Sequence, residues 1–566
     1  MLLELIACLL LFFVLTFGLA WPLAARLQLD PAEKLVASAM LSQLAAYLVA
    51  FAIYLLGLPV AAFWLLPVLA AAGLIAGRQA LIATARDPGA RAVLIGQLLV
   101  TGWCTGWLFF IASYSGGGWA GDWYEHWERT RFFLERWPVE TRFLGFGALP
   151  ARPPLANLVT GALLALTPGA FAYYQLFITL LGTVSFLPAA LLVRRFAPRA
   201  TGPAAVAVFA VLLMLNPSYV ENATFAWTKL TAVFFILTGL YFFLRTLDPG
   251  APRAAGPLSA LALAAGLLAH YSAGPYVLLL AVAWFVLNRA RWPDRAFWRQ
   301  TAQLALIGAL VLATWFAWSL AVYGPHTTLL SNSSVAVKDA QSGNQLLKIA
   351  LNVRDTLVPH FLRHLDGALI AQTSPWGYWR DWFFQLYQVN LFFVFGSVAW
   401  LALVRELGRG WGAAAPRSRW FWAGFCGGVI LLGVAVHGAR DSWGLAHICL
   451  QAVVVLGLAY LAARWANLGR GWRIVLAAGA ALDLFLGVAL QFAVQSYAFD
   501  RWFTPGRPFL DTLQSYSESS VMNAAGKIVH HLAFFREEFH VPAALVLALL
   551  AGILTLAIAR AARRPG

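Results

Sequence analysis

Long apolar stretches recur from one end of the 566-residue chain to the other. About 20 apolar residues in a helix cross the ~30 Å hydrocarbon core of a bilayer. Hydrophobic residues make up 61% of the chain and charged residues only 11%, whereas ordinary soluble domains contain about 25% charged residues. The strands of a transmembrane barrel would instead alternate apolar and polar residues over about 10 positions. We therefore predict an all-α polytopic membrane protein.

About 15 transmembrane helices are expected from the apolar stretches. The predicted spans are 2–23, 36–57, 59–77, 92–112, 171–193, 202–216, 223–244, 257–270, 271–288, 302–322, 383–404, 420–437, 443–463, 474–494 and 542–561. The spans 257–270 and 271–288 meet at a polar break, so the pair is alternatively one kinked segment.

The net charge of +16 is mostly a signal of membrane topology. Arginines gather in short connections on alternate sides of the predicted spans, and the positive-inside rule places those connections in the cytoplasm. The long connections 113–170, 323–382 and 495–541 then lie outside, together with the short turns 217–222 and 437–442. We expect a multi-pass protein of the plasma (inner) membrane whose active site lies on the extracytoplasmic or periplasmic face. A nucleic-acid partner is not expected.

The first outer connection contains the most informative motif, Asp122-Trp123-Tyr124-Glu125. Helical spacing groups Trp123, Trp127, Leu134 and Trp137 on an apolar side, which suits a helix lying in the membrane interface. Asp122 then occupies the first turn of this helix. A capping box formed by Asp122 and Glu125 is the alternative interpretation, and it is compatible with a catalytic carboxylate.

The remaining acids of this connection alternate with arginines. For Glu128, Glu135 and Glu140 we expect a solvated face of ion pairs. Downstream, Arg152-Pro153-Pro154-Leu155 leads the chain back into an apolar segment. The Arg152 guanidinium at the interface either contacts lipid phosphates nonspecifically or binds the phosphate of a specific substrate.

Other polar motifs lie at the predicted outer ends of later spans. They are Asn216-Pro217, Glu221, Trp227-Thr228-Lys229, His270-Tyr271 and His437-Gly438-Ala439-Arg440-Asp441-Ser442-Trp443. Together with the first-loop acid and the Arg-Pro-Pro-Leu motif, this pattern resembles the GT-C superfamily of glycosyltransferases that use polyprenyl-phosphate sugars. The resemblance is to the branch of protein O-mannosyltransferases and the lipid A aminoarabinose transferase. It implies a GT-C-like helical bundle with outer juxtamembrane helices and loops.

The resemblance also implies a reaction and a set of site residues. Asp122 would be the catalytic carboxylate that deprotonates or orients the acceptor hydroxyl, and transfer would proceed with inversion. The substrate-binding candidates are Glu125, Arg152, Lys229, His270, Tyr271, His437 and Arg440. Among them, Arg152, Lys229, His270 and Arg440 would stabilise the departing phosphate. The alternatives are a snorkelling Lys229, a packing role for His270 and an Arg440 that pairs only with Asp441.

The expected partners are a polyprenyl-phosphate sugar donor, a lipid, glycan or protein acceptor, and membrane lipids. No cofactor is certain. Asp122 and Glu125 leave a divalent cation open, although two carboxylates without an evident third ligand are weak support for a metal site.

Four helices precede the acid-bearing loop, where the superfamily usually has one. The expected organisation therefore begins with extra N-terminal transmembrane helices and ends with a basic cytoplasmic tail. The segments are 1–91, extra N-terminal helices; 92–322, catalytic membrane core with outer loop 113–170; 323–382, second outer loop; 383–494, C-terminal helices; 495–541, third outer loop; and 542–566, last helix and tail.

Two other functions remain as alternatives. A flippase or transporter of a lipid-linked sugar should place ionisable groups along a path through the membrane, and Asp483 is the one acid clearly inside a late span. A polysaccharide polymerase or ligase would share the lipid-linked donor and the outer working face.

Overall fold

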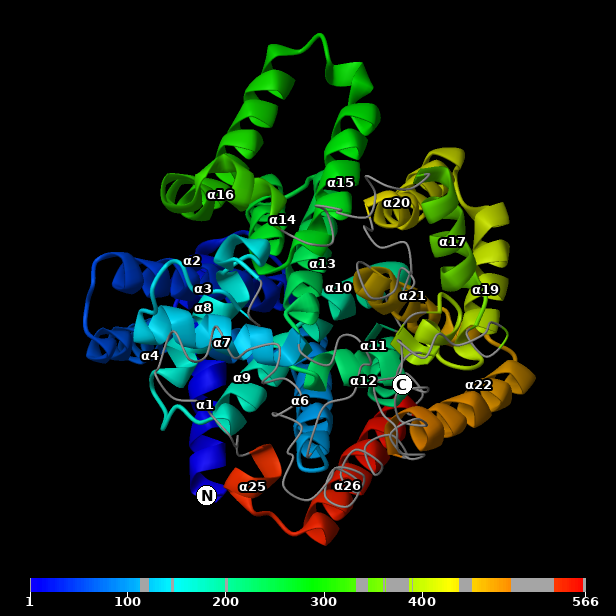
Figure 1. Ribbon diagram of the computed structural model, residues 1–566. Coiled ribbons are helices and arrows are strands. Elements are labelled where there is room, and N and C mark those ends of the chain that lie inside the picture. Colours follow the sequence, from blue (N-terminus) through cyan, green and yellow to red (C-terminus); the bar gives the residue numbers. More distant parts are fainter. Residues whose placement is uncertain are drawn as a thin grey trace.

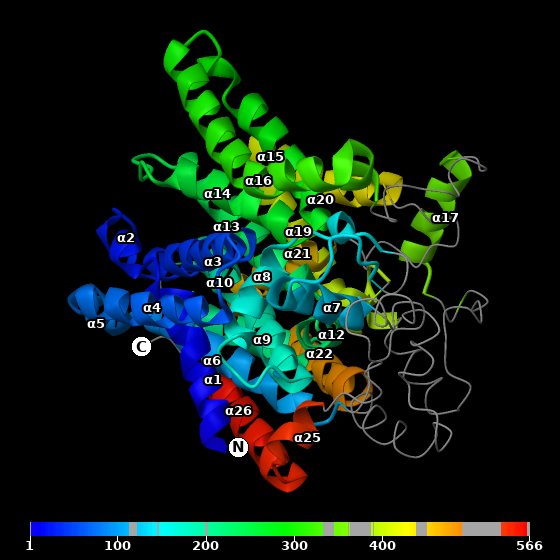
Figure 2. The same cartoon turned by 60° about the vertical axis from the view of Figure 1, so that its left-hand side comes forward.

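The computed structural model describes residues 2–111, 122–143, 147–198, 202–331, 345–359, 362, 386–388, 390–436, 450–489 and 534–562. These residues form a helical bundle. The β-type backbone pairing among them is limited to one antiparallel bridge between Phe143 and Gly147. Figure 1 shows α10 and α13 near the centre, with α15 and α16 projecting together from the bundle. Figure 2 shows α17 to one side of it. The fold is therefore all-α, as the sequence predicts.

The α-helices of the described residues are α1 (Leu2–Gly18), α2 (Trp21–Arg26), α3 (Pro31–Leu55), α4 (Leu65–Ala76), α5 (Arg78–Arg86), α6 (Pro88–Leu108), α7 (Asp122–Glu135), α8 (Leu155–Leu164), α9 (Phe171–Thr183), α10 (Phe186–Phe196), α11 (Gly202–Leu215), α12 (Pro217–Thr224), α13 (Lys229–Thr246), α14 (Ala255–Ala269), α15 (Gly274–Leu287), α16 (Arg295–Leu330), α17 (Gln345–Leu357), α19 (Ala399–Ala413), α20 (Pro416–Val436), α21 (Leu450–Ala463), α22 (Arg470–Asp483), α25 (Phe535–Phe539) and α26 (Ala543–Ala562).

Within the described residues, six helices are long and apolar enough to cross a membrane, or up to eight if each bent pair is one span. The chain is thus a multi-pass membrane protein, and the expected number of about 15 spans is not confirmed. The apolar stretch that runs through α9 and α10 is fully buried, whereas little of the apolar stretch in α16 is buried. Exposed leucines along α16, including Leu306, Leu310 and Leu320, suit a helix surrounded by lipid.

Two expected connections contain helices that the sequence did not predict. The outer turn predicted at 217–222 is the buried helix α12, which follows α11 at an angle of 72°. Asn216 caps it by accepting a hydrogen bond from the Tyr219 backbone N–H at 2.7 Å. The first outer connection 113–170 contains α7 and the buried apolar helix α8, whose ten residues are fewer than the about 20 that cross a bilayer.

The span expected at 383–404 is also interrupted. The 3-10 turn η10 (Phe393–Phe395) ends at Gly396, whose φ of 107° suits glycine, and α19 begins only at Ala399. Asp483 stabilises the break, because its carboxylate accepts the Ser397 backbone N–H at 2.9 Å and lies too close to Gly396 for a Cβ at that position. A buried carboxylate thus replaces the helical hydrogen bonding at this break.

Two glycines allow α1 and α4 to touch backbone to backbone. A Cβ added at Gly73 would lie 2.3 Å from the carbonyl oxygen of Gly18, a contact that side-chain movement cannot relieve. We therefore expect Gly73→Ala to lower the free energy of unfolding by about 1–3 kcal/mol. Gly308→Ala in α16 is the matched control, since no atom lies within 4 Å of its added methyl group. Thermal unfolding in detergent measures both, and equal melting temperatures for the two variants would contradict the close packing.

Candidate active site

Helix α7 begins at Asp122 and packs its aromatic side against the protein. Trp123 is fully buried, with its ring centroid 5.0 Å from that of Phe171 and 5.8 Å from that of Phe534. Trp127 is 4% exposed and contacts Phe171 and Tyr174. The expected amphipathic helix is present, but these tryptophans contact α9 and the C-terminal segment instead of lipid.

A buried ion pair within α7 fixes the helix to the chain that follows it. Glu125 Oε1 accepts from Arg129 Nη2 at 2.7 Å, and the Arg129 side chain has no exposed surface. Arg129 also donates to the carbonyl oxygens of Leu149 at 2.6 Å and Ala148 at 3.0 Å. The backbone ahead of Arg152 is therefore held directly against α7.

Arg152 lies between the two carboxylates at the start of α7. Its Nε is 3.3 Å from Glu125 Oε2, and its Nη2 is 3.8 Å from Asp122 Oδ1. Pro153 and Pro154 follow and lead into α8. Since its side chain is 19% exposed, the guanidinium lies mainly among the residues of the site. Asp122, at 22% side-chain exposure, is the more accessible of its two partners.

Lys229, the first residue of α13, brings a second cation to the same place. The residue is 4% exposed, and its Nζ lies 3.5 Å from the centroid of the Trp227 ring. Within the part of the chain that the structure describes, Nζ has no hydrogen-bond partner. Lys229 is close enough to Asp122 and Arg152 for their charges to interact. An anion bound beside this buried amine would favour its protonated, cationic form.

His270 and Tyr271 complete this side of the site. The Tyr271 hydroxyl donates to the Pro150 carbonyl oxygen at 3.0 Å and so supports the segment that carries Arg152. His270 Nδ1 accepts from the Ser272 backbone N–H at 3.1 Å, and its ring is within electrostatic range of Arg152 and Lys229. The structure thus brings five of the residues singled out from the sequence close to Asp122 or to its partner Arg152: Glu125, Arg152 itself, Lys229, His270 and Tyr271.

The two carboxylates of α7 have opposite pKa shifts. Burial raises the pKa of Asp122, and the charges of Arg152 and Lys229 only partly counter this effect. Burial would also raise the pKa of Glu125, but Arg152 and Arg129 outweigh it and lower that pKa to about 2. Glu125 therefore stays ionised as a partner of arginines, whereas Asp122 is suited to accept a proton. A divergence of this kind between neighbouring acids is typical of catalytic sites.

The structure corrects the expectation of a solvated acidic face. Glu128 and Arg129 are 1% and 0% exposed, so they belong to the interior. Glu135 follows the expectation, since its carboxylate pairs with Arg131 at 2.7 Å on the surface. Of the other candidates, His437 and Arg440 lie outside the described residues.

Sequence reasoning missed two buried neighbours of the site. Arg129 was available from its spacing, because a Glu and an Arg four residues apart lie on one helix face. His126 gave no comparable signal; it is 2% exposed, and burial lowers its pKa to about 3, so it is neutral. Among the described residues, no group of three or more His, Cys, Asp or Glu side chains could hold a metal ion. The divalent cation left open above therefore gains no further ligand here.

No protein-family model and no curated protein matches the chain. Among solved structures, the chain is similar to ArnT from Cupriavidus metallidurans bound to undecaprenyl phosphate, with a TM-score of 0.45 and 16% identity over 83% of this chain and 76% of that one. The apo state of the same protein gives a TM-score of 0.44 at 16% identity, covering 83% of this chain and 75% of that one.

A further similarity is to the archaeal oligosaccharyltransferase AglB from Archaeoglobus fulgidus in complex with an inhibitory peptide and a dolichol-phosphate. Its TM-score is 0.37 at 14% identity, over 76% of this chain and 59% of that one. Because all three TM-scores are below 0.5, we rest the function proposed below on the residues of the site.

The buried pair of α7 predicts a large effect on stability. Arg129→Gln would remove the closer of the two arginines that pair with the buried Glu125, and breaking a buried ion pair typically costs about 3–5 kcal/mol. Arg131→Gln, two residues along the same helix, removes a more exposed pair of the same spacing together with contacts to the Trp127 and Trp137 rings, and should cost about 1–2 kcal/mol. Thermal unfolding of the two variants in detergent distinguishes them. Equal losses would show that the Glu125–Arg129 pair does not hold the site together.

Proposed function

We propose that the chain is an integral-membrane glycosyltransferase that takes a sugar from a polyprenyl-phosphate donor and adds it to an acceptor on the extracytoplasmic face. One observation carries the proposal. An accessible carboxylate with a raised pKa, Asp122, lies beside Arg152 and beside Lys229, whose buried amine has no hydrogen-bond partner among the described residues. A base next to cations available for an anion is what displacement of a phosphate leaving group requires.

The donor proposed here is an amphiphile, with a tail in the bilayer, a phosphate at the interface and a sugar in water. Lys229 and Arg152 would bind the phosphate. Arg129 is held by Glu125 and also interacts with the buried Glu128, whereas the Lys229 amine has no hydrogen-bond partner among the described residues. A phosphodiester anion would supply the partner that Lys229 lacks.

Asp122 would accept the proton of the acceptor hydroxyl. As that oxygen attacks the anomeric carbon, a new glycosidic bond forms and the bond between the anomeric carbon and the phosphate oxygen breaks. The phosphate leaves with the electron pair, and Lys229 and Arg152 stabilise its developing charge. A single displacement of this kind inverts the configuration at the anomeric carbon.

The other residues of the site would act by positioning. Glu125 orients Arg152 through their 3.3 Å contact, and Tyr271 supports the same segment at Pro150. We assign His270 to the phosphate side because of its proximity to Lys229 and Arg152. His437 and Arg440 stay candidates for substrate binding on the strength of their sequence motif alone.

The alternative of a transporter receives less support from the late helices. Asp483, the acid that would mark a pathway, accepts hydrogen bonds from the Ser397 backbone N–H at 2.9 Å and the Tyr387 hydroxyl at 3.1 Å. These bonds give Asp483 a structural role at the start of α19. The acceptor class, whether lipid, glycan or protein, follows from none of these contacts and is left to the assay.

Asp122→Asn should abolish sugar transfer without preventing folding. The amide has a similar size but cannot accept the acceptor's proton, so we expect a loss of about 10²–10⁴-fold in turnover. The assay uses proteoliposomes, radiolabelled polyprenyl-phosphate sugars and a membrane extract as acceptor. Glu135→Gln, which alters an exposed pair on the same helix, is the matched control and should transfer at the wild-type rate. If the wild type and Asp122→Asn both leave every donor intact and move labelled lipid between leaflets, the protein is a flippase.

The raised pKa of Asp122 predicts a particular dependence on pH. The carboxylate must be ionised to accept a proton, so kcat/KM should fall as the pH is lowered through this pKa, above the range of an ordinary aspartate. Arg152 lowers the pKa of Asp122, so this pKa should rise in Arg152→Gln. The residual activity of the variant should therefore fall off at a higher pH than that of the wild type. If the acid limb has the same midpoint in both proteins, Asp122 is not the base that titrates.

A further inference from the structure

A second charged cavity lies at the opposite end of the helices that build the proposed active site. Helix α13 begins with Lys229 at that site and has Arg245 in its last turn, a separation of about 24 Å at 1.5 Å per residue. Helix α3 repeats the arrangement, because its Tyr54 contacts Phe132 of α7 while Glu33 lies in its first turn. This end of the bundle carries the arginines that predict the cytoplasmic face.

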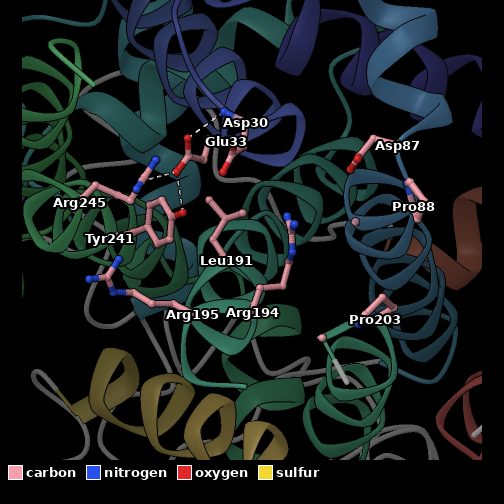
Figure 3. Close-up of a pocket in the computed structure, with 12 residues that line it drawn as sticks. Asp30, Glu33, Asp87, Pro88, Leu191, Arg194, Arg195, Pro203, Tyr241 and Arg245 are labelled. Atoms are coloured by element: carbon pink, nitrogen blue, oxygen red, sulfur yellow. Dashed lines mark hydrogen bonds and ion pairs between the residues drawn. The ribbon is translucent and has the colours of Figure 1, made fainter. Parts of the chain in front are cut away.

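The cavity has a volume of about 470 Å³, within the range of small-molecule sites. Its walls come from the first turns of α3, α6 and α11 and from the last turns of α10 and α13 (Figure 3). The charged residues that line it are Asp30, Glu33, Asp87, Arg194, Arg195 and Arg245.

Three of these charged groups, Glu33, Arg195 and Arg245, are already held in ion pairs. Glu33 Oε1 accepts from Arg245 Nε at 2.7 Å and from the Tyr241 hydroxyl at 2.7 Å. Asp248 pairs with Arg195 at 2.7 Å and with Arg245 at 3.0 Å. Asp87 caps α6 by accepting the Ala90 backbone N–H at 2.7 Å. The network forms a fixed polar wall, and Arg195 and Arg245 are not free to neutralise a ligand.

Arg194, Asp30 and Asp87 differ from the rest of the charged lining. The structure gives none of these three side chains an ion pair within the residues that it describes. The Arg194 guanidinium lies against the first turn of α6, since a Cβ added at Gly89 would be 2.6 Å from its Nη2. Figure 3 shows the side chain extending from α10 into the space between Asp30 and Asp87. The cavity therefore offers one cation and two carboxylates without an ionic partner among the described residues, and Asp30 is the more exposed of the two carboxylates.

A cation and carboxylates in the same cavity disfavour a ligand that carries only positive or only negative charge. A simple anion drawn to Arg194 would be repelled by Asp30 and Asp87, and a simple cation at Asp30 would be repelled by Arg194. We propose that this cavity binds an aminoalkyl phosphate group, with the phosphate on Arg194 and the ammonium on Asp30. The planar guanidinium suits phosphate oxygens, and a carboxylate suits an ammonium. The head group of an ethanolamine phospholipid and soluble phosphoethanolamine share this chemistry.

Native mass spectrometry of the full-length protein in detergent tests the proposal. The probes are dioleoylphosphatidylethanolamine, dioleoylphosphatidylglycerol, which lacks the ammonium, and soluble phosphoethanolamine. We expect the ethanolamine lipid to bind more tightly than the glycerol lipid, and Arg194→Gln to weaken its binding about tenfold, as loss of a charge-assisted hydrogen bond implies. Arg291→Gln, an exposed arginine bonded to Gln300 outside the cavity, is the matched control and should bind like the wild type.

Asp30→Asn provides the second test, because asparagine also caps helices well and α3 should stay intact. This variant should lose the preference for the ethanolamine lipid over the glycerol lipid. Competition by soluble phosphoethanolamine identifies the soluble molecule as the natural source of the group, whereas binding of the lipid alone identifies the membrane. Equal binding of the two lipids to the wild type would overturn the proposal, as would unchanged binding by folded Arg194→Gln.

Discussion

The buried ion pair between Glu125 and Arg129 is the interaction on which the proposed active site depends. It lies within one helix, yet through the carbonyl oxygens of Ala148 and Leu149 it holds the following segment against that helix. Two charges without water are costly unless every donor and lone pair finds a partner. Here the guanidinium bonds the carboxylate and two carbonyl oxygens, and Glu125 also contacts Arg152. The arrangement fixes Arg152 beside Asp122.

This geometry gives two similar carboxylates different roles. Glu125 is held ionised by two arginines, whereas Asp122 has one longer contact to Arg152 at 3.8 Å and greater exposure. Asp122 is therefore the carboxylate that is available to accept a proton. Lys229 approaches from α13, so the site forms only when the chain around α7 and the start of α13 pack together. The proposed chemistry accordingly depends on tertiary packing more than on any single motif.

The sequence predicted the helical membrane fold because long apolar stretches have few other structures available. It also predicted α7 and several residues that the structure brings together, since Asp122, Arg152, Lys229 and His270 are polar groups at the ends of apolar stretches. It could not predict that α12 is buried or that Gly396 breaks the span at 383–404, because both depend on distant partners such as Val394 and Asp483. The burial of Arg129 was missed for the same reason: hydropathy does not reveal which charges find partners.

The proposed reaction requires that Lys229 and Arg152 bind the phosphate of a lipid donor next to Asp122. An experimental structure of the protein in a lipid nanodisc with an added polyprenyl phosphate tests this binding most directly. We expect phosphate density within about 4 Å of Lys229 Nζ and the Arg152 guanidinium, with the tail in the bilayer. Ordered polyprenyl phosphate bound elsewhere, with Lys229 still unpartnered over Trp227, would contradict it.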